Sequence, residues 1–343
     1  MQALVQHCAD HNIELRVVVD AAFQELLATA LPSELLLLYP RKQIKQSKGA
    51  WQKARVYLNF LLQLRQFKAD LAFNIEEDSV SHRLTQFSGA AYRLGCSTAR
   101  HGWGYDRVLP IDFSKRSAEQ QHRWYSFAEV FAAVGVKVTA PIYLQFPLRP
   151  APEALMQKMQ ALRLNLEHGF VAVHAGATKK YKMWPLSHFV ELIERIVQTG
   201  KQVVLIGSGA DADNINAIVA QLSPACAQGV VNACNQFALA ELVHFFRYAT
   251  FVIGNDSGPF HLASALHVKG AVIFGPTDVR LWGPLSSQSV VLKGTEPCSA
   301  DCTRKQCLHQ HRCLWSIKPA NVLQQMQAQL AVVAEAPTAS RTS

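Results

Sequence analysis

The second half of the chain alternates short apolar segments with amphipathic ones. Uninterrupted apolar segments predict strands at 170–173, 202–206, 230–231, 250–253 and 270–274. The segments between them, near 186–199, 211–222, 238–248 and 260–267, have the periodicity of helices that bury one face. Apolar strands separated by helices indicate a parallel sheet covered on both faces. We therefore predict a doubly wound, Rossmann-like α/β domain here.

The first half shows the same alternation less regularly. Strands are predicted at 14–19, 35–39, 71–74, 91–94 and 108–111, and helices near 22–29, 50–67, 80–88 and 119–134. Prolines from Pro141 to Pro152 interrupt both periodicities and predict a linker. The length of 343 residues exceeds that of a usual single domain. We expect two α/β domains, 1–148 and 149–334, facing each other across a cleft, and a disordered polar tail at 335–343.

Charge and composition narrow the class of partner. The chain carries 34 Lys and Arg against 25 Asp and Glu, a formal net charge of +9, which favours an anionic partner such as a phosphorylated lipid or a nucleotide. The basic residues are scattered, so we do not predict nucleic-acid binding. No apolar run approaches the length of a membrane helix, and the first residues lack a signal-peptide pattern. These features predict a cytoplasmic protein.

The stretch Gly254 to His261, GNDSGPFH, joins a predicted strand to a predicted helix. Small residues carry the backbone around a tight corner, and the N-terminus of the helix presents free N–H groups and a positive dipole end to a phosphate. The carboxylate of Asp256 repels phosphate, so it is expected to accept hydrogen bonds from hydroxyl groups or to cap the helix. A sugar attached to a diphosphate satisfies both features. His261 either reaches a phosphate or caps and packs.

Two further turns leave strands at the same predicted edge of the sheet, where doubly wound folds bind ligands. The first runs from His174 through Gly176 to Lys182 and is rich in lysine. An ammonium group there would neutralise the charge that develops on a departing diphosphate, although a solvated basic loop is the alternative. His174 ends its strand where it would contact the ligand. In the second turn, Thr277 offers a hydroxyl and a backbone N–H to a phosphate.

Together these stretches resemble a known family. They read VAVHAGATKKYKMWPLSHFVELI, VVLIGSGAD, FVIGNDSGPFHLASAL and VIFGPTD, and in order and spacing they are similar to the lipopolysaccharide heptosyltransferases of glycosyltransferase family 9. The N-terminal half resembles the family more loosely, through ELRVVVDAAFQELL and SHRLTQFSGAAYRLG. The resemblance implies the GT-B fold, in which two Rossmann-like domains face a cleft. It also implies a peripheral enzyme at the inner face of the cytoplasmic membrane.

The resemblance also implies an activity and residue roles. The C-terminal domain would bind ADP-heptose or a related nucleotide sugar, and the N-terminal domain the lipid-linked core of lipopolysaccharide. Lys182 would contact the diphosphate, Asp256 the sugar hydroxyls, and Ser257 and Gly258 the phosphates through their amides. Lys182 and Asp256 are therefore the predicted catalytic residues of an inverting transfer that requires no metal and no other cofactor.

One departure concerns the general base. The family begins with a strand and a glycine-aspartate turn, and its aspartate resembles the base that deprotonates the acceptor. This chain opens at what resembles the middle of the helix that follows. We therefore expect an N-terminal domain without its first strand, and the alternative function is a catalytically impaired or non-catalytic nucleotide-sugar-binding relative. The remaining base candidates are Glu76, Glu77 and Asp78, for which a solvated acidic loop is the competing interpretation.

Cysteine and tryptophan are the remaining residue types with candidate roles. Four cysteines lie within sixteen residues, Cys298, Cys302, Cys307 and Cys313. They predict either a structural zinc site or reduced packing cysteines, and their gaps do not match the paired two-residue spacing of zinc ribbons. The isolated tryptophans are expected in the core or in an acceptor groove: Trp51, Trp103, Trp124, Trp282 and Trp315.

Overall fold

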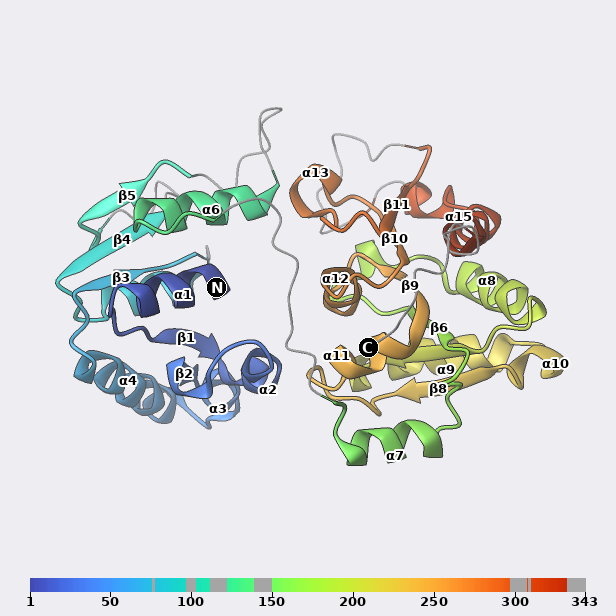
Figure 1. The fold of residues 1–343 in the computed structure, drawn as a ribbon, viewed down its shortest axis with the longest axis horizontal. Helices are drawn as coiled ribbons and strands as arrows, with labels where there is room; N and C mark the ends of the chain where they lie inside the picture. Colours follow the sequence, from blue (N-terminus) through green and yellow to red (C-terminus); the bar gives the residue numbers. More distant parts are fainter. Residues whose placement is uncertain are drawn as a thin grey trace, which may run out of the picture. The chain divides into compact units, whose positions relative to one another are not determined.

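The computed structural model describes residues 1–75, 78–96, 103–111, 122–138, 150–296, 307 and 310–331. The chain divides into two compact units, Met1–Ala140 and Pro141–Ser343, and each is described by itself (Figure 1). The predicted domain boundary at 148 and 149, most of the predicted linker and the predicted tail at 335–343 lie outside the described residues.

The second unit contains a parallel six-stranded sheet. Its strands are β6 (Phe170–His174), β7 (Val203–Gly207), β8 (Val230–Cys234), β9 (Ala249–Asn255), β10 (Gly270–Phe274) and β11 (Ser289–Lys293), in the order β11-β10-β9-β6-β7-β8. The five strands predicted from the apolar segments are confirmed. The sixth, β11, was not predicted, because it lies at an edge of the sheet and is only half-buried.

Helices cover both faces of this sheet, as the apolar strands require. The longer ones are α7 (Glu153–Ala161), α8 (Leu186–Gln198), α9 (Ala212–Gln221), α12 (Gly258–Ala265) and α15 (Pro319–Ala331). The shorter ones are α10 (Pro224–Ala227), α11 (Leu242–Phe245), α13 (Val279–Trp282) and α14 (Arg312–Trp315), with 3₁₀ turns η3 (Lys180–Lys182), η4 (Gly209–Asp211) and η5 (Phe246–Tyr248). Figure 1 shows α8 and α15 on one side of the strands and α11 and α12 on the other.

Alternate strand residues explain the two covered faces. Val171 and Val173 pack with Phe189 and Ile193 of α8 in one apolar core. Phe170, the neighbour of Val171, points the other way and lies against Phe245 of α11, with ring centroids 4.9 Å apart. The sheet is therefore buried on both sides, and only the loops at its ends remain for binding.

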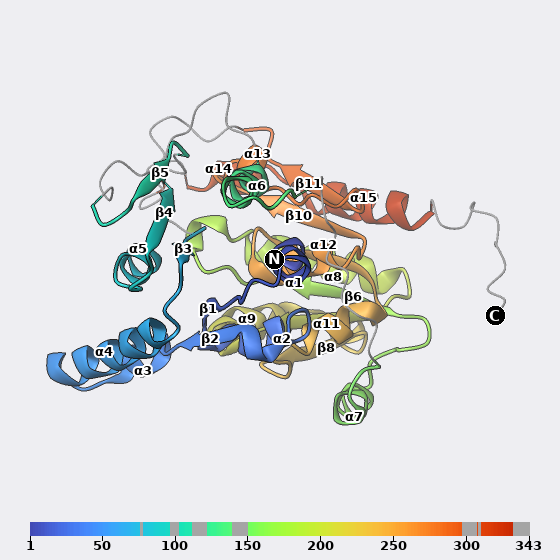
Figure 2. The ribbon, with the colours of Figure 1, turned by 60° about the vertical axis from the view of Figure 1, so that its left-hand side comes forward.

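The first unit contains two parallel sheets. β1 (Val17–Asp20) pairs with β2 (Leu36–Tyr39), and β3 (Leu71–Phe73), β4 (Tyr92–Cys96) and β5 (Arg107–Leu109) form the second sheet. The helices are α1 (Gln2–Asp10), α2 (Gln24–Ala28), α3 (Arg41–Gln46), α4 (Ala50–Gln66), α5 (Ser79–Gln86) and α6 (Arg123–Ala133), with 3₁₀ turns η1 (Ala21–Phe23) and η2 (Ser33–Leu35). Figure 2 shows α4 at the outer edge of this unit. The predicted strands of this half are confirmed with shifts of up to three residues at their ends.

Four of the five isolated tryptophans do not lie in a core. The exposed fractions are 83% for Trp51, 74% for Trp103, 47% for Trp282 and 46% for Trp315. A core position is therefore excluded for these four, because apolar character alone does not tell which face of an element a residue occupies, and a position in an acceptor groove stays a prediction. Among the described residues, no helix combines the length and the apolar character that crossing a membrane requires.

Candidate functional site

The ends of three strands bring the predicted binding residues to one edge of the second unit's sheet. β6 ends at His174, β9 at Asn255 and β10 at Phe274. After β6 the chain adds β7 and β8 on one side, and it then returns to add β9, β10 and β11 on the other. Doubly wound sheets bind ligands beyond the carboxyl ends of the strands where this reversal occurs. The loops after β6 and β9 are therefore the expected binding site.

Asp256 is the centre of a polar cluster at this edge. Lys182 Nζ donates to its Oδ2 at 2.6 Å, His261 Nε2 lies 3.0 Å from its Oδ1, and the side chain of Thr277 also hydrogen-bonds to it. The side chain of Asp256 is 5% exposed, whereas those of Lys182 and His261 are 24% and 36% exposed. A buried carboxylate thus holds two nitrogen-bearing side chains that reach the surface.

The environment of Asp256 keeps it ionised. Burial opposes the charge, but hydrogen bonds from His261, Lys182 and Thr277, together with the charge of Lys182, outweigh burial and lower the pKa of Asp256 to about 2. At neutral pH the carboxylate is therefore an acceptor only. It cannot donate a proton, and its role at this edge is to orient donors.

The N-terminus of α12 follows directly. Ser257 is its N-cap residue, but the Ser257 hydroxyl does not cap the helix and lies 3.0 Å from Nδ1 of His174. The N–H groups of the first turn, including that of Gly258, have no acceptor within the helix, and the helix dipole favours an anion there. A Cβ placed on Gly258 would meet no atom within 4 Å. Donors and open space therefore coincide, as a phosphate site requires.

Asp211 lies in the turn after the neighbouring strand β7, next to two residues of this site. A Cβ on Gly176 would clash with the carboxylate of Asp211, so a larger residue at position 176 requires this side chain to move. Oδ2 of Asp211 accepts from the backbone N–H and the hydroxyl of Ser208, each at 2.8 Å, and lies 3.9 Å from His174 Nε2. Burial lowers the pKa of His174, with partial opposition from Asp211, so its ring is neutral at neutral pH.

Asn255 connects the loops that carry these residues. Its side chain is fully buried; Nδ2 donates to the carbonyl oxygens of Ala175 at 2.8 Å and Gly176 at 3.1 Å, and Oδ1 accepts from the N–H of Trp184 at 3.0 Å. Trp184 is itself buried and donates from Nε1 to the carbonyl of Ile317 at 3.0 Å. One amide side chain thereby fixes both ends of the loop that contains Lys182.

The structure places every predicted donor-binding residue at the carboxyl end of β6, in the loops after β6, β9 and β10, or in the first turn of α12. They are His174, Gly176, Lys182, Asp256, Ser257, Gly258, His261 and Thr277. Their contacts with a donor remain predictions. The sequence interpretation missed the roles of Asn255 and Asp211, although a polar residue at the end of an otherwise apolar strand is a usable signal for Asn255.

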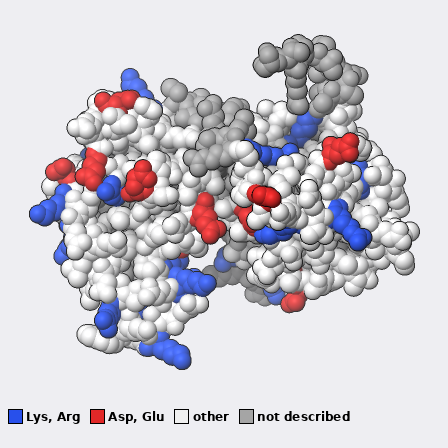
Figure 3. Space-filling model, turned by 60° about the horizontal axis from the view of Figure 1, so that its bottom comes forward, with Lys and Arg blue, Asp and Glu red and all other residues white. Residues whose placement is uncertain are grey.

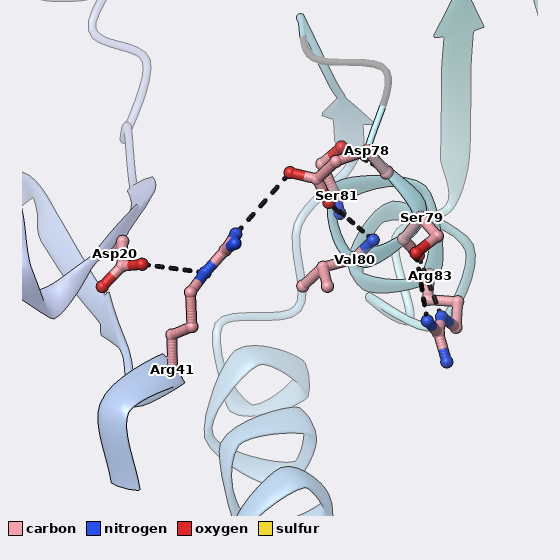
Figure 4. Close-up of polar contacts among 7 residues, drawn as sticks. All are labelled: Asp20, Arg41, Asp78, Ser79, Val80, Ser81 and Arg83. Carbon is pink, nitrogen blue, oxygen red and sulfur yellow. Dashed lines mark hydrogen bonds and ion pairs between the residues drawn. The ribbon is translucent and has the colours of Figure 1, made fainter. Parts of the chain in front are cut away.

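In the first unit, the base candidate Asp78 has a structural role. It is the N-cap residue of α5, and its Oδ1 accepts from the N–H groups of Val80 at 2.6 Å and Ser81 at 2.9 Å. Arg41 Nη2 lies 3.6 Å from its other oxygen, and Arg41 Nε lies 2.8 Å from Asp20 Oδ2 (Figure 4). The carboxylate of Asp78 is therefore occupied by a helix end and a guanidinium.

Several other predicted residues are not described. Glu76, Glu77, Cys298 and Cys302 lie outside the described residues. The sulfur of Cys307 accepts a hydrogen bond from the N–H of His311 at 3.1 Å. Within the described ranges, no group of three or more His, Cys, Asp or Glu side chains is arranged to hold a metal ion. Because two of its four cysteines lie outside those ranges, the zinc site stays a prediction.

Comparison with known proteins gives consistent results. The model of glycosyltransferase family 9 (heptosyltransferase) matches residues 58–312. Lipooligosaccharide heptosyltransferase 2 of Campylobacter jejuni is 26% identical over 147 residues, 43% of this chain and 46% of that protein. Lipopolysaccharide heptosyltransferase 1 of Pseudomonas aeruginosa is 24% identical over 311 residues, 87% of this chain and 80% of that protein. The chain thus matches less than half the length of the first of these relatives.

A solved structure is similar over nearly the whole chain. The Escherichia coli ADP-heptose lipopolysaccharide heptosyltransferase II superimposes with a TM-score of 0.70 at 20% identity, covering 97% of this chain and 95% of that one. At this identity the similarity establishes the fold. The predicted α/β fold of the GT-B heptosyltransferases is therefore confirmed.

Proposed function

Because the chain belongs to glycosyltransferase family 9, the heptosyltransferases, we propose that it transfers heptose from ADP-heptose to the inner core of lipopolysaccharide. The substrates follow from the relatives, which include heptosyltransferases of lipopolysaccharide and lipooligosaccharide. The observation that carries the proposal is the cluster of Lys182, Asp256 and His261 beside the N-terminus of α12. Its position at the reversal of strand order is where a nucleotide-sugar diphosphate is expected to bind.

The chemistry of this cluster suits an inverting transfer. The acceptor hydroxyl gives its proton to a general base, for which Glu76, Glu77 and Asp78 are the candidates. Its oxygen forms a bond to the anomeric carbon from the face opposite the diphosphate, and the bond from that carbon to the diphosphate oxygen breaks. The electron pair and its negative charge pass to the departing ADP. The Lys182 ammonium and the N–H groups at the start of α12 stabilise that charge without a metal ion. Because Asp256 and Asn255 already hold this loop, little reorganisation is needed at the moment of reaction.

Asp256 has a twofold role in the proposed complex. Its carboxylate orients Lys182 and His261 toward the surface. An ionised carboxylate has about four lone-pair sites, and three side chains bond to this one. One acceptor site thus remains for a sugar hydroxyl. His174, Gly176, Ser257, Gly258 and Thr277 complete the donor pocket, the last three through hydroxyl or backbone N–H groups directed at the phosphates.

The acceptor is proposed to bind to the first unit. A lipid-linked acceptor places the reaction at the cytoplasmic face of the inner membrane, with the protein attached peripherally. The net charge of +9 suits a phosphorylated, anionic lipid.

One observation favours the alternative of a nucleotide-sugar-binding protein that does not catalyse transfer. Asp78, the one base candidate among the described residues, is engaged as a helix cap and in an ion pair. Both functions predict donor binding, and only the transferase predicts loss of heptose from the donor in the presence of an acceptor.

Donor binding is the first test. We expect ADP and ADP-heptose to raise the melting temperature of the protein at millimolar concentration, and Lys182→Gln to reduce this shift. Lys180→Gln is the matched control, since Lys180 lies in the same 3₁₀ turn and is exposed. The donor assignment is wrong if neither ligand shifts the melting temperature, or if both variants lose the shift equally. Incubation with ADP-heptose and heptose-free core lipid then separates transferase from binding protein.

A further inference from the structure

The first unit carries a basic and apolar surface that the donor site does not use. From Leu35 to Ala69 the sequence contains no Asp or Glu and eight basic residues: Arg41, Lys42, Lys45, Lys48, Lys53, Arg55, Arg65 and Lys68. This segment forms β2, α3 and α4. Arg41 pairs with Asp20 and Asp78, which lie outside the segment. Because the segment contains no Asp or Glu, none of its basic residues has a carboxylate partner within it. The lower left of Figure 3, on the side of the first unit, shows basic side chains without acidic neighbours.

Helix α4 within this segment is apolar on two faces. Its inner face packs Phe60 and Leu61 against Tyr39 and Leu84. Its outer face carries Trp51, Leu58 and Leu62, which are 83%, 55% and 60% exposed. At 100° per residue these three side chains fall within about 40° of one another, in a stripe about 16 Å long. An outer apolar stripe of this kind is not needed to fold the helix.

Basic side chains accompany the stripe. Arg55 lies four residues after Trp51 and three before Leu58, and so on the same side of the helix. Lys45 and Lys48 lie in α3 and in the turn before α4, and both are exposed. We define Lys45, Lys48, Trp51, Arg55, Leu58 and Leu62 as the α4 surface. Tryptophan and leucine beside lysine and arginine are the composition of helices that lie in the interface of an anionic bilayer.

We propose that the α4 surface docks the protein onto anionic phospholipid. The proposal rests on the proposed function in one respect, since a lipid-linked acceptor requires the enzyme to reach a membrane. The leucines distinguish this partner from a nucleic acid, because a phosphate backbone offers nothing for Leu58 and Leu62 to bury against. The basic side chains attract the protein to anionic headgroups, and the side chains of the apolar stripe insert below those headgroups.

Co-sedimentation of the full chain with vesicles tests the proposal. We expect binding to vesicles of phosphatidylglycerol and phosphatidylethanolamine, and little binding to phosphatidylcholine alone. Each basic side chain contributes about fivefold to such binding, so the double variant Lys48→Gln/Arg55→Gln is expected to bind about 25-fold more weakly. Trp51→Ala is expected to bind about tenfold more weakly, because a large apolar side chain no longer leaves water.

Matched controls come from the same chain. Trp103→Ala removes another exposed tryptophan of the first unit, and Lys137→Gln/Arg163→Gln removes two exposed charges elsewhere. Both controls are expected to bind vesicles within twofold of the wild type. The proposal is overturned by equal binding to both vesicle types, by equal effects of test and control variants, by tighter binding to a DNA duplex, or by a Trp51→Ala variant that turns a dimer into a monomer in solution.

The melting-temperature shift with ADP, measured on the same variants, separates the two proposals. Vesicle binding without a response to ADP contradicts the proposed function and leaves the α4 surface supported. A response to ADP without vesicle binding contradicts the α4 surface and leaves the transferase supported.

Discussion

Replacing Asp256 by asparagine removes one negative charge and almost preserves the shape of the side chain. In the wild type the carboxylate accepts from Lys182 at 2.6 Å and lies 3.0 Å from His261 Nε2. In Asp256→Asn the amide nitrogen is a donor only, and the Lys182 ammonium loses the charge with which it is paired. We expect the loop of Lys182 to become less stable and donor binding to weaken.

The size of the effect follows from the pKa of Asp256. That pKa is about 2 in the folded protein and 3.8 in its reference state. A difference of about two units corresponds to about 2.5 kcal/mol in favour of the ionised form in the folded state. Solvent screening is small because the side chain of Asp256 is 5% exposed. Lys182, at 24% exposure, can still turn toward water, so we expect Asp256→Asn to lower the free energy of unfolding by about 2 kcal/mol at pH 7.

The sign of the pH dependence is fixed by the direction of the shift. A carboxylate whose pKa is lower when folded stabilises the fold fully above its unfolded pKa, and that stability is lost as the pH falls through the folded pKa. The difference between wild type and Asp256→Asn should therefore be constant from pH 7 to about 5 and decrease between about 4 and 2.

Hydrogen exchange of peptides from β6 and β9, measured at increasing urea, reports the stability of the second unit separately from the first. Asp278→Asn is the matched control: Asp278 caps α13, and it pairs with Arg280, whose side chain is 60% exposed. The control variant Asp278→Asn should lower the free energy of unfolding by less than about 1 kcal/mol. The reasoning is refuted if Asp256→Asn costs less than about 0.5 kcal/mol at pH 7, or if its cost persists unchanged at pH 3.

Four further variants have expected outcomes. Gly176→Ala should lower the free energy of unfolding of the second unit by about 1 kcal/mol in the same exchange assay, because its Cβ would displace the Asp211 carboxylate from Ser208. Gly258→Ala should leave stability intact and weaken ADP binding in calorimetry, because its Cβ would enter the open space at the start of α12. Asn255→Ala removes three buried hydrogen bonds and should lower the free energy of unfolding by about 3 kcal/mol. ADP should then no longer raise the melting temperature. Asp78→Ala should cost about 1 kcal/mol, seen as faster exchange in α5, with ADP binding unchanged.

The sequence was most informative where local pattern and burial agree. Strands buried on both faces, such as β6 and β10, have nearly continuous apolar sequences, and their predicted bounds match the structure within a residue. Edge and half-buried elements carry a weaker pattern, which is why β11 and α3 were not predicted. The turns that follow buried strands were also predictable, because topology places all carboxyl ends of a parallel sheet at one edge.

The pairings within the site were not predictable from the sequence. Lys182 and Asp256 are 74 residues apart in the chain, and Asn255 bonds to residues up to 80 positions away. Spacing in sequence contains no information on such contacts. The sequence of a basic loop is the same whether its lysine is solvated or paired with a carboxylate. The clash that a side chain at Gly176 would make likewise depends on Asp211, which lies in the turn after β7.

The pairing of Lys182 with Asp256 explains how a carboxylate can lie at the proposed phosphate site. An isolated carboxylate there would repel the ligand, but this one is buried beneath its partners and accepts hydrogen bonds from three side chains. Its charge keeps the ammonium in place while no ligand is bound, so that the lysine does not sample other orientations in water. A diphosphate carries more negative charge than one carboxylate, and it can share the ammonium without displacing it. Catalysis by this arrangement then depends on charge that is fixed in position before the donor arrives.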